Sequence, residues 1–355
     1  MDTVPLLKQL SETPGISGYE QAIRDLVRDS LARFADEVRE DKLGNLIALK
    51  RGEGEPPHRR LMLAAHMDEI GLIVSGIEKG FLRITPVGGT DRRLLWGQKV
   101  TVHGRRDLPG IVGSRPPHVL PPDQRDKALP WEELFVDVGL PPEEVEKLVR
   151  VGDLISFRQE ALELKGDLFS GKALDNRASV AALILALEAL SSMRHRWDVY
   201  AVATVQEEVG LFGAMTSAYG LAPDAAIAVD VTFGRQNGVP EEESFALGKG
   251  PTIAYGPNIH PRLFEELEAT AKALEVPYQV EPIPGRSGTD AWAIQVSREG
   301  IPTGLVSIPL RYMHSPVETV NLKDLERTAR LLAGFVARLE PDFLASDEDF
   351  QTSGA

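Results

Sequence analysis

Three short motifs of the chain each place a metal-binding side chain directly after apolar, β-prone residues: AHMDEIG, VQEEVG and AVDVT. Their polar residues are His66, Asp68, Glu207, Glu208 and Asp230. Open α/β sheets build their sites at the carboxyl ends of strands. Histidine nitrogen and carboxylate oxygen are ligands that zinc and related divalent ions take in proteins. We therefore expect a metal centre at one edge of a sheet.

His66 and Asp68 are separated by one residue. In an extended backbone their side chains leave the same face, so Asp68 can accept the imidazole proton that does not face a metal and fix the tautomer of His66. A His-x-Asp sequence also arises by chance in a chain with 7 histidines. Its position at the end of a predicted strand favours the functional interpretation.

Glu207 and Glu208 are adjacent carboxylates that follow the apolar run VYAVATVQ. Two such charges repel one another unless a cation holds them or solvent screens them. A solvated acidic turn is the simpler interpretation. A hydrolytic metal site, however, needs one carboxylate as a ligand and a second that takes the proton from the attacking water. Neighbouring residues at a strand end can divide these two roles.

Asp175, Asp230 and His314 each have a structural explanation beside the functional one. Asp175 precedes an apolar helix and could be its N-cap, Asp230 could stabilise a turn, and His314 could brace the loop RYMHSPVE. Five separate segments nevertheless deliver a ligand to the same edge of one predicted sheet. The combination predicts a two-metal hydrolase. The expected metal ligands are His66, Asp175, Asp230, His314 and one of the two adjacent glutamates, Glu207 and Glu208.

Segments with apolar residues three and four apart alternate with short β-prone runs. This pattern predicts an α/β fold whose mixed sheet is covered by helices on both faces. The expected helices are 21–34, 176–190, 261–274, 289–296 and 322–339, and the expected strands are 46–50, 61–65, 198–205, 225–229, 252–255 and 303–308.

A stretch rich in Gly, Pro and short strands, with one helix near 142–150, interrupts this alternation and is expected to form an inserted, mostly β domain. The predicted α/β catalytic domain is therefore discontinuous, with residues 1–69 and 166–345, and the β domain takes residues 70–165. The acidic tail 346–355 is expected to be disordered. A chain of 355 residues exceeds the usual size of a single core, which agrees with two domains.

The formal net charge of -14 argues against nucleic acid or an anionic membrane as a partner, because Lys and Arg bind both. The chain has no cysteine, which excludes disulfides, thiolate nucleophiles and Cys-ligated zinc. The first ten residues lack the basic and apolar regions of a secretory signal, and the most apolar helix, 178–190, is too short to span a membrane. We expect a cytoplasmic protein.

The order of the motifs AHMDEIG, ALDNR, QEEVG, AVDVT, GTDA and RYMHSPVE, with residues 113–118 and ELFVDVG in the insert, resembles the tetrahedral-type aminopeptidases. These are cocatalytic metallopeptidases with a zinc-peptidase-like fold, and some members carry the name endoglucanase. The resemblance runs from about Val4 to Leu339 and shows no departure at a metal or catalytic position.

The resemblance implies two divalent metal ions in each subunit. One ion would be held by His66, Asp175 and Asp230, and the other by Asp175, Glu208 and His314, so that Asp175 bridges them. Zinc is the first expectation, and cobalt or manganese would suit the same ligands.

The resemblance also assigns Glu207 as the general base and Asp68 as the support of His66. The substrates would be peptides, and the enzyme would release their amino-terminal residues. The inserted β domain would pair subunits, and the dimers would assemble into a tetrahedral homo-dodecamer.

Three other functions stay open at this stage. A deacylase or carboxypeptidase would use the same metal centre and bind a substrate carboxylate, for which Arg286 is a candidate. A glycoside hydrolase would need two carboxylates about 5–9 Å apart and would leave both histidines unexplained. A scaffold with purely structural metals would not need Glu207 as a spare carboxylate. Asp290, in SGTDA, is a candidate for shaping the amino-terminal end of the substrate, or for a helix N-cap region.

Overall fold

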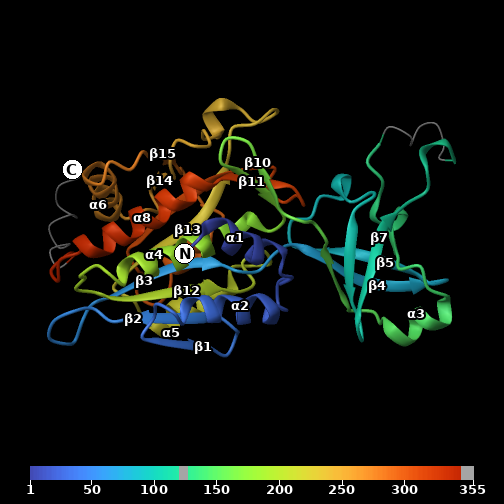
Figure 1. The fold of residues 1–355 in the computed structure, drawn as a ribbon, viewed down its shortest axis with the longest axis horizontal. Helices are drawn as coiled ribbons and strands as arrows, with labels where there is room; N and C mark the ends of the chain where they lie inside the picture. The colour runs from blue at the N-terminus through green and yellow to red at the C-terminus, as the bar shows by residue number, and fades with distance from the viewer. Residues whose placement is uncertain (120–126, 345–355) are drawn as a thin grey trace.

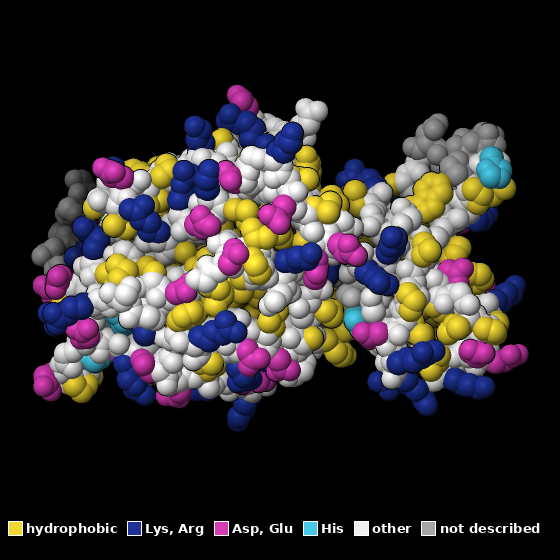
Figure 2. All heavy atoms as spheres, viewed as in Figure 1, with side chains coloured by type: hydrophobic (Ala, Val, Ile, Leu, Met, Phe, Trp, Pro, Cys, Tyr) yellow, Lys and Arg dark blue, Asp and Glu magenta, His cyan; other side chains and the backbone are white. Residues whose placement is uncertain are grey.

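The computed structural model describes residues 1–119 and 127–344, which form two bodies joined by a narrow connection (Figure 1). The larger body is a mixed sheet packed between helices, and the smaller body is a closed β-barrel. On the face drawn in Figure 2, acidic and basic side chains are interspersed over both bodies. No helix among the described residues is long and apolar enough to cross a membrane.

The sheet of the larger body is built from strands that come from both ends of the chain. They are β1 (Glu37–Glu40), β2 (Leu46–Lys50), β3 (Arg60–His66), β10 (Leu162–Leu164), β11 (Leu168–Gly171), β12 (Asp198–Thr204), β13 (Ala225–Phe233), β14 (Thr252–Tyr255), β15 (Gln279–Pro282), β16 (Thr303–Arg311) and β17 (Glu318–Asn321). The order is β1-β2-β12-β3-β13-β16-β17-β11-β10, with β14 beside β16 and β15 beside β14. The central strands β12, β3, β13 and β16 are parallel, so their carboxyl ends meet at one edge.

Helices cover both faces of this sheet, which explains why its central strands are almost continuously apolar. The helices of the larger body are α1 (Thr3–Glu12), α2 (Gln21–Leu31), α4 (Leu174–Leu190), α5 (Phe212–Leu221), α6 (Pro261–Ala273), α7 (Asp290–Ile294) and α8 (Leu322–Arg338). Successive side chains of β13 point to opposite faces of the sheet. Ile227 and Val229 belong to the core under α4 and α8, whereas Ala226 and Ala228 belong to the core under α5 and α7. By the same alternation, Asp230 is on the α5 and α7 side.

The smaller body is a barrel with its own hydrophobic core. Its elements are β4 (Gly71–Glu78), β5 (Phe81–Val87), β6 (Lys99–His103), β7 (Asp107–Gly113), β8 (Phe135–Asp137), α3 (Pro142–Leu148) and β9 (Leu154–Phe157). The strands close in the order β4-β5-β8-β7-β6-β9, so each of these six strands has a partner on both sides. The chain enters the barrel directly after His66 and Asp68 and returns to the sheet through β10 and β11.

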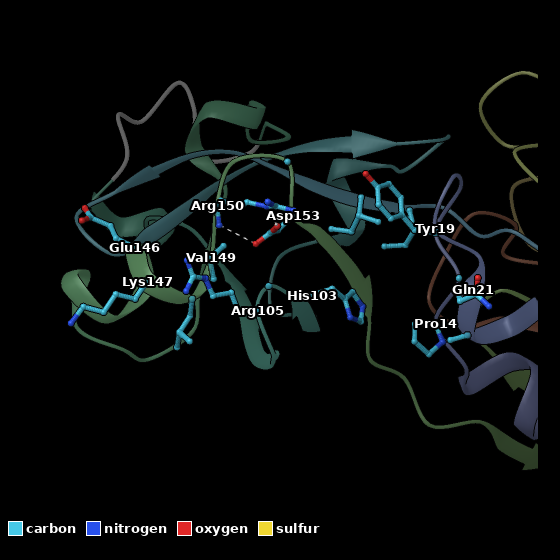
Figure 3. A pocket seen from close by; sticks show the side chains of 17 residues that line it. Pro14, Tyr19, Gln21, His103, Arg105, Glu146, Lys147, Val149, Arg150 and Asp153 are labelled. Atoms are coloured by element: carbon cyan, nitrogen blue, oxygen red, sulfur yellow. Dashed lines mark hydrogen bonds and ion pairs between the residues drawn. The ribbon is translucent and has the colours of Figure 1, made fainter. Parts of the chain in front are cut away.

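A cavity of about 540 Å³ lies between the two bodies (Figure 3). Tyr19 lines it from the larger body, and His103, Arg105, Arg150 and Asp153 line it from the barrel. None of the predicted metal ligands lines this cavity. The cavity is therefore separate from the predicted chemistry.

The predicted fold class is confirmed, since a mixed sheet covered by helices carries a separate β-barrel. The expected helices and strands are present with ends that differ by a few residues. Two helices were missed: α1 has only 10 residues and a proline in its first turn, and the sequence of α5, FGAMTSAYGL, contains two glycines and little amphipathic pattern. The tail 346–355 lies outside the described residues. The domain division at residues 70 and 165 stays a prediction.

Candidate metal centre

The strand ends bring the predicted ligands to one place. His66 is the last residue of β3 and pairs in register with Thr204, the last residue of β12. Glu207 and Glu208 follow β12 at once, where the chain turns towards α5. Asp230 lies in β13, which runs parallel to β3 on its other side. The parallel centre of the sheet thus delivers the His66 imidazole and three acids, and α4 carries the fourth acid, Asp175.

His66 is the centre of the first ligand group, and it is 1% exposed. Its Nε2 lies 3.2 Å from Oδ1 of Asp175 and 3.8 Å from both Oε2 of Glu207 and Oδ1 of Asp230. Ligand atoms of His66, Glu207 and Asp230 all lie within 4.8 Å of one another. One cation could therefore contact all three side chains.

The second ligand group consists of Asp175, Glu208 and His314, whose ligand atoms also lie within 4.8 Å of one another. Nε2 of His314 is 3.5 Å from Oδ2 of Asp175 and 3.6 Å from Oε2 of Glu208. Asp175 thus points one oxygen at each histidine. This geometry matches a carboxylate placed between two cations.

The backbone around Asp175 departs from a regular helix. Asp175 has φ -78° and ψ 99°, and the N-cap of α4 is Ala173. The carboxylate of Asp175 faces His66 and His314, which favours the ligand interpretation over the N-cap interpretation. Although burial raises the pKa of Asp175, hydrogen bonds from His314 and His66 hold it below its ordinary value.

Asp68 is fully buried and supports the turn after β12. Its carboxylate accepts the backbone N–H groups of Glu207 at 3.0 Å and Glu208 at 3.2 Å, and the hydroxyl of Ser17 at 2.6 Å. Nδ1 of His66 lies 3.4 Å from Oδ1 of Asp68, and no well-aligned hydrogen bond forms between them. Asp68 therefore holds the acidic pair more directly than it holds His66. No local pattern in the chain predicts this contact.

Glu318 and Gly89 are parts of the site that sequence reasoning missed. Glu318 is buried and accepts the backbone N–H groups of Asp175 and His314, each at 2.9 Å, which ties the two segments of the second group together. The carbonyl of Gly89, from the barrel, lies 3.3 Å from Nδ1 of His314. A side chain at Gly89 would overlap the His314 ring. The motif RYMHSPVE contains Glu318, but only the folded chain shows what it binds.

The site holds more negative charge than its own cations balance. Burial raises the pKa of Glu207 to about 10, with repulsion from Asp230 added, although His66 opposes the change. Burial, then the charge of Asp175, raises the pKa of Glu208 to about 8. Burial also raises the pKa of Asp230. Ionised carboxylates at this depth need positive charge to be stable.

The donor set fits two divalent cations. Each group offers one imidazole and two carboxylates, which suit zinc, cobalt and manganese. Both histidines turn Nε2 to the cluster, and their Nδ1 atoms face an oxygen of Asp68 or of Gly89. A hydrogen bond of this kind fixes the tautomer that binds a metal, and the Gly89 carbonyl supplies it for His314.

Asp290 and Arg286 do not belong to either group. Asp290 is 2% exposed and accepts a hydrogen bond from Thr204 at 2.5 Å, and burial raises its pKa to about 6. The N-cap of α7 is Thr289. The Arg286 guanidinium stacks on the ring of Trp292, 5.0 Å from its centroid. Asp290 lies near the acidic cluster without belonging to a ligand group, and its role stays a prediction.

Comparison with known protein families identifies the family to which the chain belongs. The family model of the M42 glutamyl aminopeptidases matches residues 44–331, a range that contains every residue of the cluster. The chain belongs to the M42 glutamyl aminopeptidase family. Members are hydrolases that act on peptide bonds, and the resemblance to tetrahedral aminopeptidases is confirmed.

Individual M42 relatives match the chain almost from end to end. A lysyl aminopeptidase of Pyrococcus furiosus is 42% identical over 345 residues, covering 95% of this chain and 97% of its own. The structure of an aminopeptidase from the archaeon Desulfurococcus kamchatkensis has a TM-score of 0.89 and 42% identity, with 96% of each chain covered. A TET1 peptidase of Pyrococcus horikoshii, which can assemble into a tetrahedron or a large octahedral shell, has a TM-score of 0.84 and 35% identity, covering 95% of this chain and 100% of that one.

Proposed function

We propose that the protein is a metal-dependent aminopeptidase that releases amino-terminal residues from peptides. The observation that carries the proposal is the convergence of two imidazoles and four carboxylates in two adjoining ligand groups at the carboxyl edge of the sheet. The lysyl aminopeptidase and the Desulfurococcus aminopeptidase, both 42% identical to this chain, are named for the same reaction.

We assign His66, Asp175 and Asp230 to one divalent ion and Asp175, Glu208 and His314 to the other, with Asp175 shared. Support comes from the two oxygens of Asp175, which face different histidines. When bound, the two cations would supply Lewis acidity, which polarises the scissile carbonyl and lowers the pKa of a water molecule. Zinc, cobalt and manganese are the candidate ions.

Glu207 is the proposed general base. It takes a proton from the attacking water as the new C–O bond forms, and it gives that proton to the leaving amine nitrogen as the C–N bond breaks. Asp68 is a positioning residue, because it accepts the N–H of Glu207 and so fixes the turn that carries the base. Glu207 also lies 3.8 Å from Nε2 of His66, so its assignment as base rather than ligand needs a test of its own.

We further propose that the barrel pairs subunits and that the dimers form a dodecamer. The barrel exposes large apolar side chains, among them Trp96 at 50% and Ile111 at 56%. Exposed apolar side chains of this size are typical of protein interfaces. The Pyrococcus horikoshii relative that assembles into a tetrahedron supports the same outcome here.

The test of the proposed function compares peptides with a free amino terminus against their N-acetylated forms. The full chain is assayed after chelation and again after addition of zinc, cobalt or manganese. We expect hydrolysis of the free peptides only, with loss on chelation and recovery on metal addition. Equal or faster hydrolysis of the acetylated peptides would instead identify a deacylase or endopeptidase.

A further inference from the structure

The cavity between the two bodies is a second candidate site, separate from the metal centre (Figure 3). Its volume of about 540 Å³ is within the range of small-molecule pockets, which occur preferentially where two domains meet. Trp96 and Ile111, the apolar side chains proposed to pair subunits, do not line it. The cavity is therefore available to a ligand other than a peptide substrate or a second copy of the chain.

The charges around the cavity favour an anion. Five charged side chains line it, three basic and two acidic: Arg105, Lys147, Arg150, Glu146 and Asp153. Asp153 is already neutralised, because its carboxylate accepts the backbone N–H of Arg150 at 2.9 Å and lies 3.2 Å from Nε of the same residue. The chain as a whole has 39 basic and 53 acidic residues. The cavity thus has an excess of positive charge in a protein that is acidic overall.

Arg105 is the basic residue best placed to bind such an anion. Its backbone is fixed against the end of α3, since its N–H donates to the carbonyl of Leu148 at 2.8 Å. Its guanidinium, in contrast, forms no ion pair with any acid of residues 1–119 and 127–344. A free guanidinium on a fixed backbone can bind a carboxylate or a phosphoryl group through two parallel N–H···O bonds.

Tyr19 forms the opposite side of the cavity. It lies in the segment between α1 and α2 and is 64% exposed, so its ring is accessible to a ligand. Figure 3 shows Tyr19 across the cavity from Arg105 and Arg150. Aromatic rings offer a large apolar surface for packing. A ligand with an apolar body and an anionic head would therefore contact the larger body and the barrel at once.

The segment that carries Tyr19 is also bonded to the support of the metal centre. Ser17, two residues before Tyr19, donates its hydroxyl to Oδ2 of Asp68 at 2.6 Å. The same Oδ2 accepts the backbone N–H of Glu208 at 3.2 Å, and Oδ1 accepts that of Glu207 at 3.0 Å. One carboxylate thus joins the wall of the cavity to the turn that carries the acidic pair.

We propose that this cavity binds a small organic anion with an apolar body, and that its binding tightens metal binding through Ser17 and Asp68. The ligand would hold the barrel and the Tyr19 segment in one arrangement. A fixed segment keeps Asp68 and the acidic turn in place, so less ordering remains when cations bind. Such coupling is reciprocal, so metal ions tighten the binding of the anion by the same factor. The coupling rests on the proposed metal centre, whereas the binding of the anion does not.

The experiment titrates the metal-loaded full chain with benzoate and with phenylphosphonate by isothermal calorimetry. The probes share an apolar body and differ in the head group, so they distinguish a carboxylate from a phosphoryl ligand. We expect at least one probe to bind, and Arg105→Gln to weaken that binding by about 10- to 100-fold, the range of hydrogen bonds to a charged group. Failure of both probes to bind overturns the inference. Equal binding by Arg105→Gln also overturns it, because an anion held only by the metal ions does not depend on Arg105.

Arg106→Gln is the matched control for charge. Arg106 is the exposed neighbour of Arg105 and does not line the cavity, so this variant should bind the probe like the wild type. A loss as large as that of Arg105→Gln would show non-specific attraction and would overturn the inference. Tyr19→Ala tests the other side of the cavity and should also weaken binding. Unchanged binding in Tyr19→Ala contradicts a ligand that contacts both bodies.

The coupling is measured as the manganese affinity of the full chain with and without saturating probe. We expect the probe to tighten manganese binding by about 5-fold or more in the wild type. Ser17→Ala should lose this effect and still bind the probe, because it lacks only the hydroxyl that contacts Asp68. Equal manganese affinities with and without the probe in the wild type contradict the coupling. A chain that binds no divalent ion contradicts the proposed metal centre instead and leaves the anion site intact.

Discussion

The metal centre and the cluster of Glu69, Lys172 and Arg177 are two buried charged regions of the same body, and their charges are balanced differently. Nζ of Lys172 lies 2.6 Å from Oε2 of Glu69, and the Arg177 guanidinium lies 4.0 Å from Oε1. Glu69 is three residues from His66, and Lys172 is three residues from Asp175. Segments 66–69 and 172–175 therefore contribute to both regions. Glu69 is neutralised by cations of the chain, whereas Asp175 lies among carboxylates that are not neutralised in this way.

The difference teaches how to recognise a ligand site among buried acids. In the Glu69 cluster the chain supplies its own cations, and burial lowers the pKa values of Lys172 and Arg177. In the metal centre burial raises the pKa values of Glu207 and Glu208 because no Lys or Arg of the described residues balances them. The first pattern stabilises the fold by itself, whereas the second requires positive charge from outside the chain.

Lys172→Met should give the largest loss of stability, because it leaves Glu69 buried without its closest cation. Breaking a buried pair in this way costs about 3–5 kcal/mol of unfolding free energy. Added metal should not restore the loss. Lys323→Met is the control, since the Lys323–Asp167 pair is also 2.6 Å long but is about half exposed, and should cost under about 1 kcal/mol. Chemical denaturation of the chelated and metal-loaded proteins measures both, and similar losses in the two variants would contradict the comparison.

The metal-free chain should become less stable as pH rises from about 5.5 to 7.5. Glu207 and Glu208 have pKa values raised to about 10 and about 8 in the folded chain, above their ordinary 4.5, so the folded chain binds more protons than the unfolded chain in this window. The pKa of His314, raised to about 9 mainly by Asp175, acts in the same direction. The expected slope is about -1.4 kcal/mol per pH unit for each proton of difference.

Melting temperatures in chelator and in manganese, measured across this pH window, test the slope. Metal binding should remove the decline, because the cations replace the bound protons. Glu208→Gln should flatten the slope of the metal-free chain. A metal-free chain that becomes more stable with rising pH would contradict the charge assignment.

Gly89→Ala should have the smallest effect, confined to the second ligand group. The new Cβ would overlap His314, whose Nδ1 faces the Gly89 carbonyl. Loss of such an outer contact weakens metal binding by about 10- to 100-fold. Isothermal titration should show one weakened and one unchanged ion. Gly220→Ala, at a position with open space, is the control and should bind both ions normally.

The sequence predicted the fold class and the strand starts well, because both depend on local patterns, but β13 continues to Phe233, so Asp230 lies inside the strand and not in a turn after it. His66 and Asp230 could be located since each ends or continues an apolar strand, and parallel strands share an edge. Helix α5 was missed because tertiary packing, rather than amphipathic pattern, stabilises it. The strand alternation that places Asp230 was therefore a stronger signal than helical periodicity.

The contacts that hold the site were not predictable, since they join residues far apart in the chain. The amide contacts of Asp68 and Glu318 depend on how turns pack, and the carbonyl of Gly89 comes from the inserted barrel. The carboxylate of Glu281 accepts hydrogen bonds from Thr232 of β13 and Thr252 of β14, two strands whose relative placement no local sequence pattern determines. Local patterns thus predict which residues are available for chemistry, and tertiary register decides which ones meet.

The most direct test of the central claim counts divalent ions per chain in the wild type and in Glu207→Gln, together with the rate of peptide hydrolysis. If Glu207 is the base beside two cations, both proteins bind two ions, and hydrolysis in the variant falls by about 10²- to 10⁴-fold. A variant that binds fewer ions would make Glu207 a ligand. A variant that hydrolyses peptides at the wild-type rate would contradict the account.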